Sequence, residues 1–111
     1  MQDVLSIDQK HQGALRLSGE VDLSTAPQLT RALQTTVSSG GDLVVDVACV
    51  SFMDSEGLRP LLLAARLLHG RGRLVFRAPS VRVSRLFALV GADAFPNVEI
   101  DERPLVSWHG E

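Results

Sequence analysis

Residues 43–68 read LVVDVACVSFMDSEGLRPLLLAARLL, and this stretch decides the fold. Its first part, residues 43–47, is almost continuously apolar and β-branched, which is typical of a strand covered on both faces. Its second part has apolar residues at helical spacing, namely Leu58, Leu61, Leu62, Ala65 and Leu68. The stretch therefore predicts a central strand, a loop around Asp54 and a helix.

Four further strands are predicted around the central one. Residues 4–7 and 15–18 are short apolar runs with partial alternation, and polar residues 9–13 between them indicate the turn of an antiparallel hairpin. Residues 74–76 and 98–100 are short apolar segments that each follow a helical pattern. The fold class is therefore predicted as α/β, a small mixed β-sheet whose N-terminal hairpin is followed by right-handed strand-helix-strand units.

Two more helices complete the predicted order. Ser24 or Thr25 is expected to cap the first, whose opening turn accepts Pro27 because those amides lack partners within the helix. Ser80 and Gly91 mark the two ends of the last helix.

Pro60 affects where the middle helix is expected to begin. If Ser55 were the N-cap, the amide missing at Pro60 would be one that the helix normally uses, at a cost of about 3 kcal/mol. We therefore expect regular helix from Leu58 or Arg59, after an extended, partly irregular lead-in that exposes residues 53–56.

Composition limits the classes of function. With 111 residues, 45% of them hydrophobic, the chain is expected to form a single domain over residues 1–111, with its core at about 4–100 and an irregular tail at 101–111. A net charge of -2 supplies no positive field that would favour nucleic acid. A signal segment is not indicated, and charged residues and a proline interrupt residues 58–68, so we expect a cytoplasmic protein without membrane insertion. A lone cysteine in an apolar run, Cys49, is expected to be buried.

Catalytic, metal and cofactor sites are not indicated. Ser55 and His69 would lie at opposite ends of one helix, on the order of 20 Å apart at about 1.5 Å per residue, too far for a nucleophile and its base. The scattered histidines and the single cysteine lack the paired spacing of a zinc site. Gly70 and Gly72 follow a helix, whereas a phosphate-binding loop would open one. We therefore expect a non-enzymatic protein with no cofactor and no metal.

Two loops are the candidate binding surface. In sheets of this kind, binding residues gather where strands end and helices begin, which here means residues 20–25 and 52–58. Both loops carry acid and hydroxyl groups. Simple helix capping by Asp54 or Ser55, with Glu56 offsetting the positive helix end, explains the second loop equally well from the residues alone.

Two segments at the right separation resemble the STAS domain of bacterial anti-sigma factor antagonists. They are residues 19–29, GEVDLSTAPQL, and residues 50–58, VSFMDSEGL. The resemblance spans roughly residues 4–100, and its order of elements agrees with the order predicted above. It implies a STAS fold and a protein that binds an anti-sigma factor, itself a serine kinase, and so releases a sigma factor by partner switching. In the family, phosphorylation ends this binding.

The resemblance also implies the residues of the partner surface. They are Asp22, Ser24, Thr25, Met53, Asp54, Ser55, Glu56, Gly57 and Leu58. In the family the loop reads Asp-Ser-Ser/Thr-Gly-Leu, and the phosphorylated hydroxyl belongs to the position that Glu56 holds here. Ser55 matches the first serine of the pair, which is not the usual acceptor.

Three hypotheses follow for Glu56. The chain is an unswitched binder whose partner accepts the carboxylate, or Glu56 imitates the phosphorylated form, or the acceptor has shifted to Ser55. Imitation would be partial, because a carboxylate has one charge and two oxygens, against about -1.5 to -2 and three oxygens for phosphoserine. The sequence leaves open two other uses of the fold, an accessory subunit of an ABC-type lipid transporter and a scaffold of a signalling assembly, and whether the chain forms a homodimer.

Two features of the second half bear on partners. Six arginines could form a basic edge for an acidic partner, although such a run is more often a solvated face. They are Arg66, Arg71, Arg73, Arg77, Arg82 and Arg85. Trp108 in the tail either folds back over apolar surface or anchors a partner.

Overall fold

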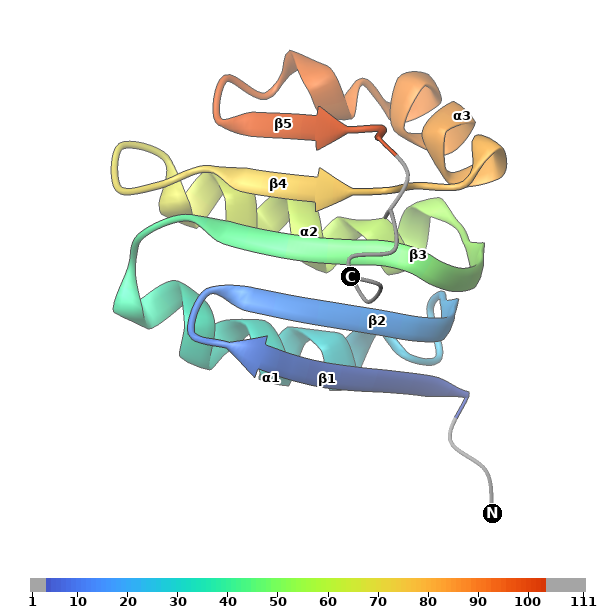
Figure 1. The fold of residues 1–111 in the computed structure, drawn as a ribbon, viewed down its shortest axis with the longest axis horizontal. Coiled ribbons are helices and arrows are strands. Elements are labelled where there is room, and N and C mark those ends of the chain that lie inside the picture. Colours follow the sequence, from blue (N-terminus) through green and yellow to red (C-terminus); the bar gives the residue numbers. More distant parts are fainter. Residues whose placement is uncertain (1–3, 104–111) are drawn as a thin grey trace, which may run out of the picture.

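The computed structural model describes residues 4–103, and the predicted order of strands and helices is confirmed. One five-stranded sheet has the strand order β1-β2-β3-β4-β5 (Figure 1). Strand β1 (Leu5–His11) pairs antiparallel with β2 (Ala14–Val21). Strands β3 (Leu43–Met53), β4 (Leu74–Arg77) and β5 (Val98–Asp101) then follow in parallel. Parallel pairing brings the carboxyl ends of β2 to β5 to one edge of the sheet.

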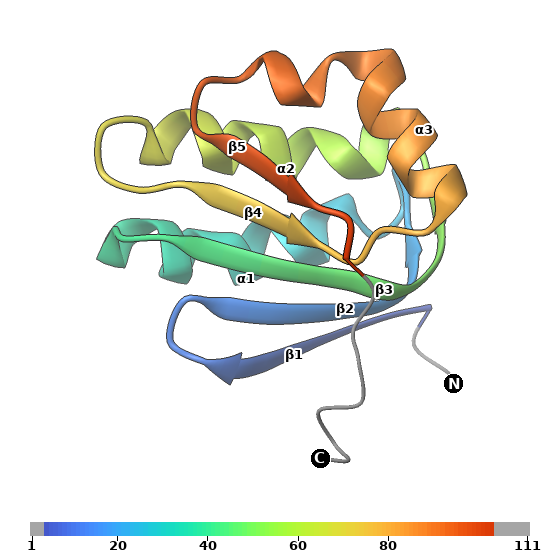
Figure 2. The same ribbon diagram turned by 45° about the horizontal axis from the view of Figure 1, so that its top comes forward.

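Helices cover one face of this sheet. Helices α1 (Ala26–Ser39) and α2 (Ser55–Leu68) lie side by side behind β1 to β4, and the described residues place no helix on the opposite face (Figures 1 and 2). Helix α3 (Val81–Val90) and the short 3₁₀ helix η1 (Ala92–Ala94) lie at the β5 end of the sheet. The architecture is therefore two layers, with an open sheet face.

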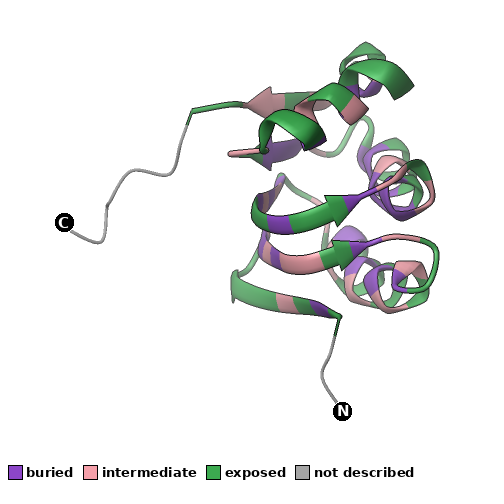
Figure 3. Cartoon of the chain, turned by 90° about the vertical axis from the view of Figure 1, so that its right-hand side faces the viewer, coloured by how far each residue is buried: buried purple, intermediate pink, exposed green. Residues whose placement is uncertain are grey.

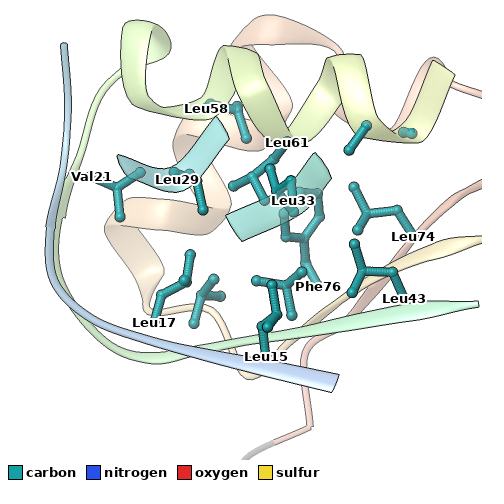
Figure 4. Close-up of a cluster of buried hydrophobic side chains, with 14 of the residues drawn as sticks. Leu15, Leu17, Val21, Leu29, Leu33, Leu43, Leu58, Leu61, Leu74 and Phe76 are labelled. Atoms are coloured by element: carbon teal, nitrogen blue, oxygen red, sulfur yellow. The ribbon is translucent and has the colours of Figure 1, made fainter. Parts of the chain in front are cut away.

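The hydrophobic core fills the space between the sheet and helices α1 and α2. Buried residues alternate in the first half of β3, are continuous over residues 74–76 of β4, and line the inner faces of the helices (Figure 3). The sheet and the helices contribute Leu15, Leu17, Leu43, Leu74, Phe76, Leu29, Leu33, Leu58 and Leu61 to this core (Figure 4). The rings of Phe76 and Phe87 lie 4.5 Å apart between centroids and attach α3 to it.

Three strand predictions need correction. Strand β3 is predicted to be covered on both faces, but within the described residues the helices cover one face alone, and Val44 and Asp46 are only partly buried. Residues 9–11, expected in the hairpin turn, continue β1, and the turn is shorter because Gly13 takes a positive φ of 80°. The central strand runs to Met53 and not to residue 47. Its pairing with β2 has register shifts, which bring Cys49 to an exposed position, so the expectation that this thiol is buried is wrong.

Helix α2 begins at Ser55, so the expected irregular lead-in to Leu58 or Arg59 is also wrong. The carboxylate of Asp54 accepts from Gly57 N at 2.9 Å, and the Asp54 carbonyl accepts from Leu58 N at 3.0 Å. Pro60 is buried within the helix. Capping and packing of the first turn therefore outweigh the single amide that Pro60 lacks.

The C-terminal end differs slightly from the prediction. Asp101 pairs with Arg77 in the sheet, so the segment beyond the last strand begins one residue later than expected. Trp108 and most of the predicted tail lie outside the described residues. Within residues 4–103, no helix combines the length and the hydropathy needed to span a membrane.

Asn97 ties α2 to the segment before β5, which generates a first prediction. Its Nδ2 donates to the carbonyl of Ala65 at 2.7 Å and to that of Gly72 at 3.1 Å. We expect Asn97→Ala to lower the free energy of unfolding by about 1–3 kcal/mol, because both part-buried carbonyls lose their donor. Urea denaturation measures this, with Gln12→Ala in the exposed hairpin turn as the control. Equal losses in the two variants would contradict this role for Asn97.

Candidate functional site

The β2–α1 and β3–α2 loops meet at the carboxyl edge of the sheet. Val21 pairs with Met53, and the amide of Asp54 donates to the Val21 carbonyl at 3.1 Å. A Cβ placed on Gly57 would lie 2.1 Å from that same carbonyl oxygen. The first turn of α2 therefore rests directly on the backbone of the neighbouring loop, which glycine permits because it has no Cβ.

Asp22 organises the β2–α1 loop. Its Oδ1 accepts from Ser24 Oγ at 2.7 Å, from Ser24 N at 3.0 Å and from Thr25 N at 3.2 Å. These bonds, led by that from the Ser24 hydroxyl, lower the pKa of Asp22 below its ordinary value, although desolvation acts in the opposite direction. The loop is thus held in shape by an ionised carboxylate.

Thr25 begins α1 by a different mechanism from the predicted cap. It is the N-cap residue, but its side chain makes no capping bond to the helix. Thr25 Oγ1 donates to the Glu20 carbonyl at 2.9 Å and accepts from Asp22 N at 3.0 Å. The Thr25 hydroxyl therefore bonds to the backbone of its own loop, and the Thr25 amide donates to the carboxylate of Asp22.

The β3–α2 loop presents Ser55 and Glu56. Ser55 is the first residue of α2 and is exposed, and its hydroxyl has no hydrogen-bond partner within the described part of the chain. The carboxylate of Glu56 lies 3.6 Å from the guanidinium of Arg59, one turn later. Both side chains are substantially exposed, so this pair contributes little to stability but partly offsets the charge of Glu56.

The structure divides the nine predicted partner-surface residues into two groups. Asp22, Ser24, Asp54, Ser55 and Glu56 are exposed or partly exposed. The buried group is Thr25, Met53, Gly57 and Leu58. The side chains of Thr25, Met53 and Leu58 are buried, and Gly57 has no side chain and lies against the backbone of the other loop, so these four residues hold the two loops in position.

Two exposed apolar residues at this edge were not in the predicted set. Leu23 is 68% exposed in the β2–α1 loop, and Phe52 is 48% exposed at the end of β3, paired with Glu20. Both residues lie within the two predicted loops, 20–25 and 52–58, and this was the available signal. Alternation along β3 gave no guide, because two register shifts against β2 interrupt it. Large apolar side chains of this kind are common anchors of protein interfaces.

The chemistry of the edge is that of a contact surface. It combines carboxylates, hydroxyls and two exposed apolar side chains, whereas His69 lies just past the far end of the helix that Ser55 begins. Residues 4–103 contain no cluster of three or more histidine, cysteine, aspartate or glutamate side chains able to hold a metal ion.

Comparison with known proteins gives consistent matches. The family model described as "Mlab, STAS domain" matches residues 6–103. The anti-sigma-B factor antagonist of Listeria monocytogenes is 39% identical over 77 residues, which are 68% of each chain. The structure of an anti-sigma factor antagonist from Mycobacterium paratuberculosis superposes with a TM-score of 0.64 at 31% identity, covering 86% of this chain and 83% of the other. The unphosphorylated anti-sigma factor antagonist SpoIIAA has a TM-score of 0.66 at 22% identity, covering 86% of both chains, and supports the fold.

The close contact at Gly57 predicts the sign of the change in stability when this glycine is replaced by alanine. Alanine in a helix is normally favoured over glycine by about 1 kcal/mol. At Gly57 we expect the opposite, a loss of about 1–3 kcal/mol, because the added methyl group would overlap the Val21 carbonyl. Denaturant unfolding of Gly57→Ala measures it. Ser55→Ala, at an exposed position in the same helical turn, is the control for an alanine that meets no backbone, and a stabilised Gly57→Ala would contradict the contact.

The lowered pKa of Asp22 generates a pH prediction. Ionised Asp22 stabilises the fold at pH values above the unfolded pKa of about 3.9, and this contribution is lost as pH falls through the lower folded value. Asp22→Asn keeps a neutral acceptor and imitates the protonated acid. We expect the natural protein to melt at a higher temperature than Asp22→Asn at pH 7, and the difference to shrink below about pH 4. Asp93→Asn, at an exposed position outside the site, is the control for loss of one charge. A difference that stays constant down to strong acid would contradict the role of the ionised form.

Proposed function

This chain belongs to the STAS-domain family, and on that premise we propose that it is an anti-sigma factor antagonist that acts in the cytoplasm by binding an anti-sigma factor. It has no catalytic role of its own. The proposal depends on the paired-loop edge, by which we mean residues 20–25 and 52–58 at the carboxyl edge of the sheet. Here Asp22 and Asp54 organise two adjoining loops beside the exposed Ser55. Relatives of known role, named anti-sigma-B factor antagonists, support the assignment.

The contact surface has a distinct composition under this proposal. Ser24, Ser55 and Glu56 offer polar groups, and Leu23 and Phe52 offer apolar area beside them. The carboxylates of Asp22 and Asp54 are occupied by loop and helix amides, so they shape the surface more than they bind a partner. A rigid surface of this kind loses little conformational entropy on association.

Glu56 acts in this proposal as part of an unswitched surface. Its carboxylate has a counter-ion, Arg59, within the same helix, and it has one charge against about -1.5 to -2 for phosphoserine. Both facts favour a partner that accepts Glu56 over one that is repelled by it. The partner is a kinase-like anti-sigma factor, and regulation of the complex takes place at another point.

Substitution of Glu56 tests this directly. We expect the affinities of Glu56→Ser and Glu56→Ala for the anti-sigma factor to lie within about threefold of that of the natural protein. The change in binding free energy would then be smaller than the roughly 1.4 kcal/mol that corresponds to a tenfold change. Isothermal titration measures the affinities, and Asp8→Ala in the distant hairpin is the charge-matched control. Markedly tighter binding by both Glu56 variants would show that Glu56 imitates the phosphorylated form. Phosphate on Ser55 after incubation with partner and ATP would show a shifted acceptor.

Glu56 also favours a second candidate function. An accessory subunit docked on the ATPase of an ABC-type lipid transporter needs no acceptor hydroxyl, and Glu56 supplies none. Affinity purification of the tagged protein from its native cell discriminates between the two. Recovery of a kinase-like anti-sigma factor supports the first candidate, whereas recovery of a transporter ATPase supports the second.

A further inference from the structure

A groove between α2 and α3 adjoins the paired-loop edge. Its walls carry Leu62, Leu63 and Arg66 from α2, with Val90 and Phe95 opposite. Ser55 and Leu58 close one end, so the groove is continuous with the proposed partner surface. Within the lining, Leu63 is 49% exposed and Val90 is 36% exposed, so apolar surface is open to solvent along the groove.

The lining of this groove carries positive charge, because it includes Arg59 and Arg66 and no acidic side chain. Helices α2 and α3 together contain four arginines and one glutamate, although the whole chain has a net charge of -2. Of the two groove arginines, Arg59 lies 3.6 Å from the exposed carboxylate of Glu56, and Arg66 has no carboxylate within 4.0 Å in residues 4–103. Arg82 and Arg85 of α3 also have none, but they do not line the groove. A ligand of this region is therefore expected to be negatively charged.

The other arginines of the second half have partners elsewhere. Arg73 pairs with Asp42 and Glu99, Arg77 lies 4.0 Å from Asp101, and Arg71 donates to a backbone carbonyl of α1. The predicted basic edge thus reduces to the arginines of α2 and α3. By contrast, the apolar groove between α1 and α2 is lined by no charged residue, so it offers no basis for selecting a charged ligand.

The spacing of the two groove arginines indicates the shape of the ligand. Arg59 and Arg66 both line the groove and are seven residues apart, which is two helical turns or about 10.5 Å. Apolar side chains lie between them, at Leu62 and Leu63. A helix with an apolar ridge flanked by carboxylates at the same seven-residue spacing would match both features.

The geometry points to an acidic amphipathic helix of the partner protein as the ligand of the α2–α3 groove. Its apolar ridge packs on Leu62, Leu63 and Val90, and its carboxylates meet Arg59 and Arg66. The inference rests on the proposed function, because it extends the same partner surface from Ser55 along α2. The stretch from Ser55 to Arg66 is about 16 Å long, enough to seat three turns of a helix.

A synthetic helix tests the groove without any natural partner. The probe is a 14-residue peptide with leucines along one face and glutamates beside them, and the control peptide has lysines in place of the glutamates. Titration into ¹⁵N-labelled protein is expected to shift the amides of residues 58–66 and 86–90 with the glutamate peptide alone. Equal shifts with both peptides, shifts confined to α1, or no shifts at all would overturn the inference.

A matched pair of charge reversals tests the same contact. Arg66→Glu is expected to weaken binding of the glutamate peptide at least about fivefold, because like charges then face each other. Arg31→Glu makes the same change on the exposed surface of α1 and is expected to stay within about twofold of the natural protein. Leu63→Asn adds a test of the apolar contact and should also weaken binding. Equal effects of the two arginine variants would overturn the inference.

Failure of the inference is distinguishable from failure of the proposed function. Suppose that an anti-sigma factor binds and that the Glu56 variants behave as expected. If Arg66→Glu then binds that partner as tightly as Arg31→Glu does, the groove is excluded as a binding site while the proposed function stands. If affinity purification recovers no anti-sigma factor, the peptide titration still decides whether the groove accepts an acidic helix.

Discussion

The contact between Gly57 and the backbone of Val21 and Asp22 is the constraint on which the candidate site depends. Without a side chain at this position, α2 begins directly against the β2–α1 loop, with a virtual Cβ 2.1 Å from the Val21 oxygen. Two loops that are about thirty residues apart in sequence thereby form one surface. The contact holds the first turn of α2 against this loop, and the arginines of the α2–α3 groove follow along the same helix.

Most of the fold follows from local patterns, and the failures have tertiary causes. The β-branched run at residues 43–47 and the leucines of α2 identified the central strand and its helix, although that strand is covered on one face and not on both within the described residues. Ser80 and Gly91 marked the ends of α3 as predicted. Pro60 misled the prediction of where α2 begins, because helix propensity does not include the Asp54 cap or the packing of Gly57. The predicted burial of Cys49 was wrong for a similar reason, because a register shift between two strands is a property of the pair and not of either strand's sequence.

The candidate site was predictable in location but not in the roles of its residues. Strand order and helix starts indicated both loops, and the structure brings them together. Residue type could not separate the exposed Ser55 from the buried Thr25, because burial depends on which way each loop turns. Phe52 lies in the predicted loop but was left out of the nine partner-surface residues, while its buried neighbour Met53 was included. Register shifts along β3 decide which of the two side chains faces the core. The hydrogen bonds of Asp22, which set the shape of its loop, involve backbone amides that a sequence does not display.

The carboxyl edge of the sheet, with its two hydrogen-bonded loops, is proposed as the surface that binds the partner. Hydrogen–deuterium exchange of the protein alone and in complex with its anti-sigma factor tests this most directly. The account predicts slower exchange on binding for amides of residues 20–25 and 54–66, with little change in the hairpin at residues 5–15. Slower exchange confined to the hairpin and the open face of the sheet, with the two loops unaffected, would contradict it.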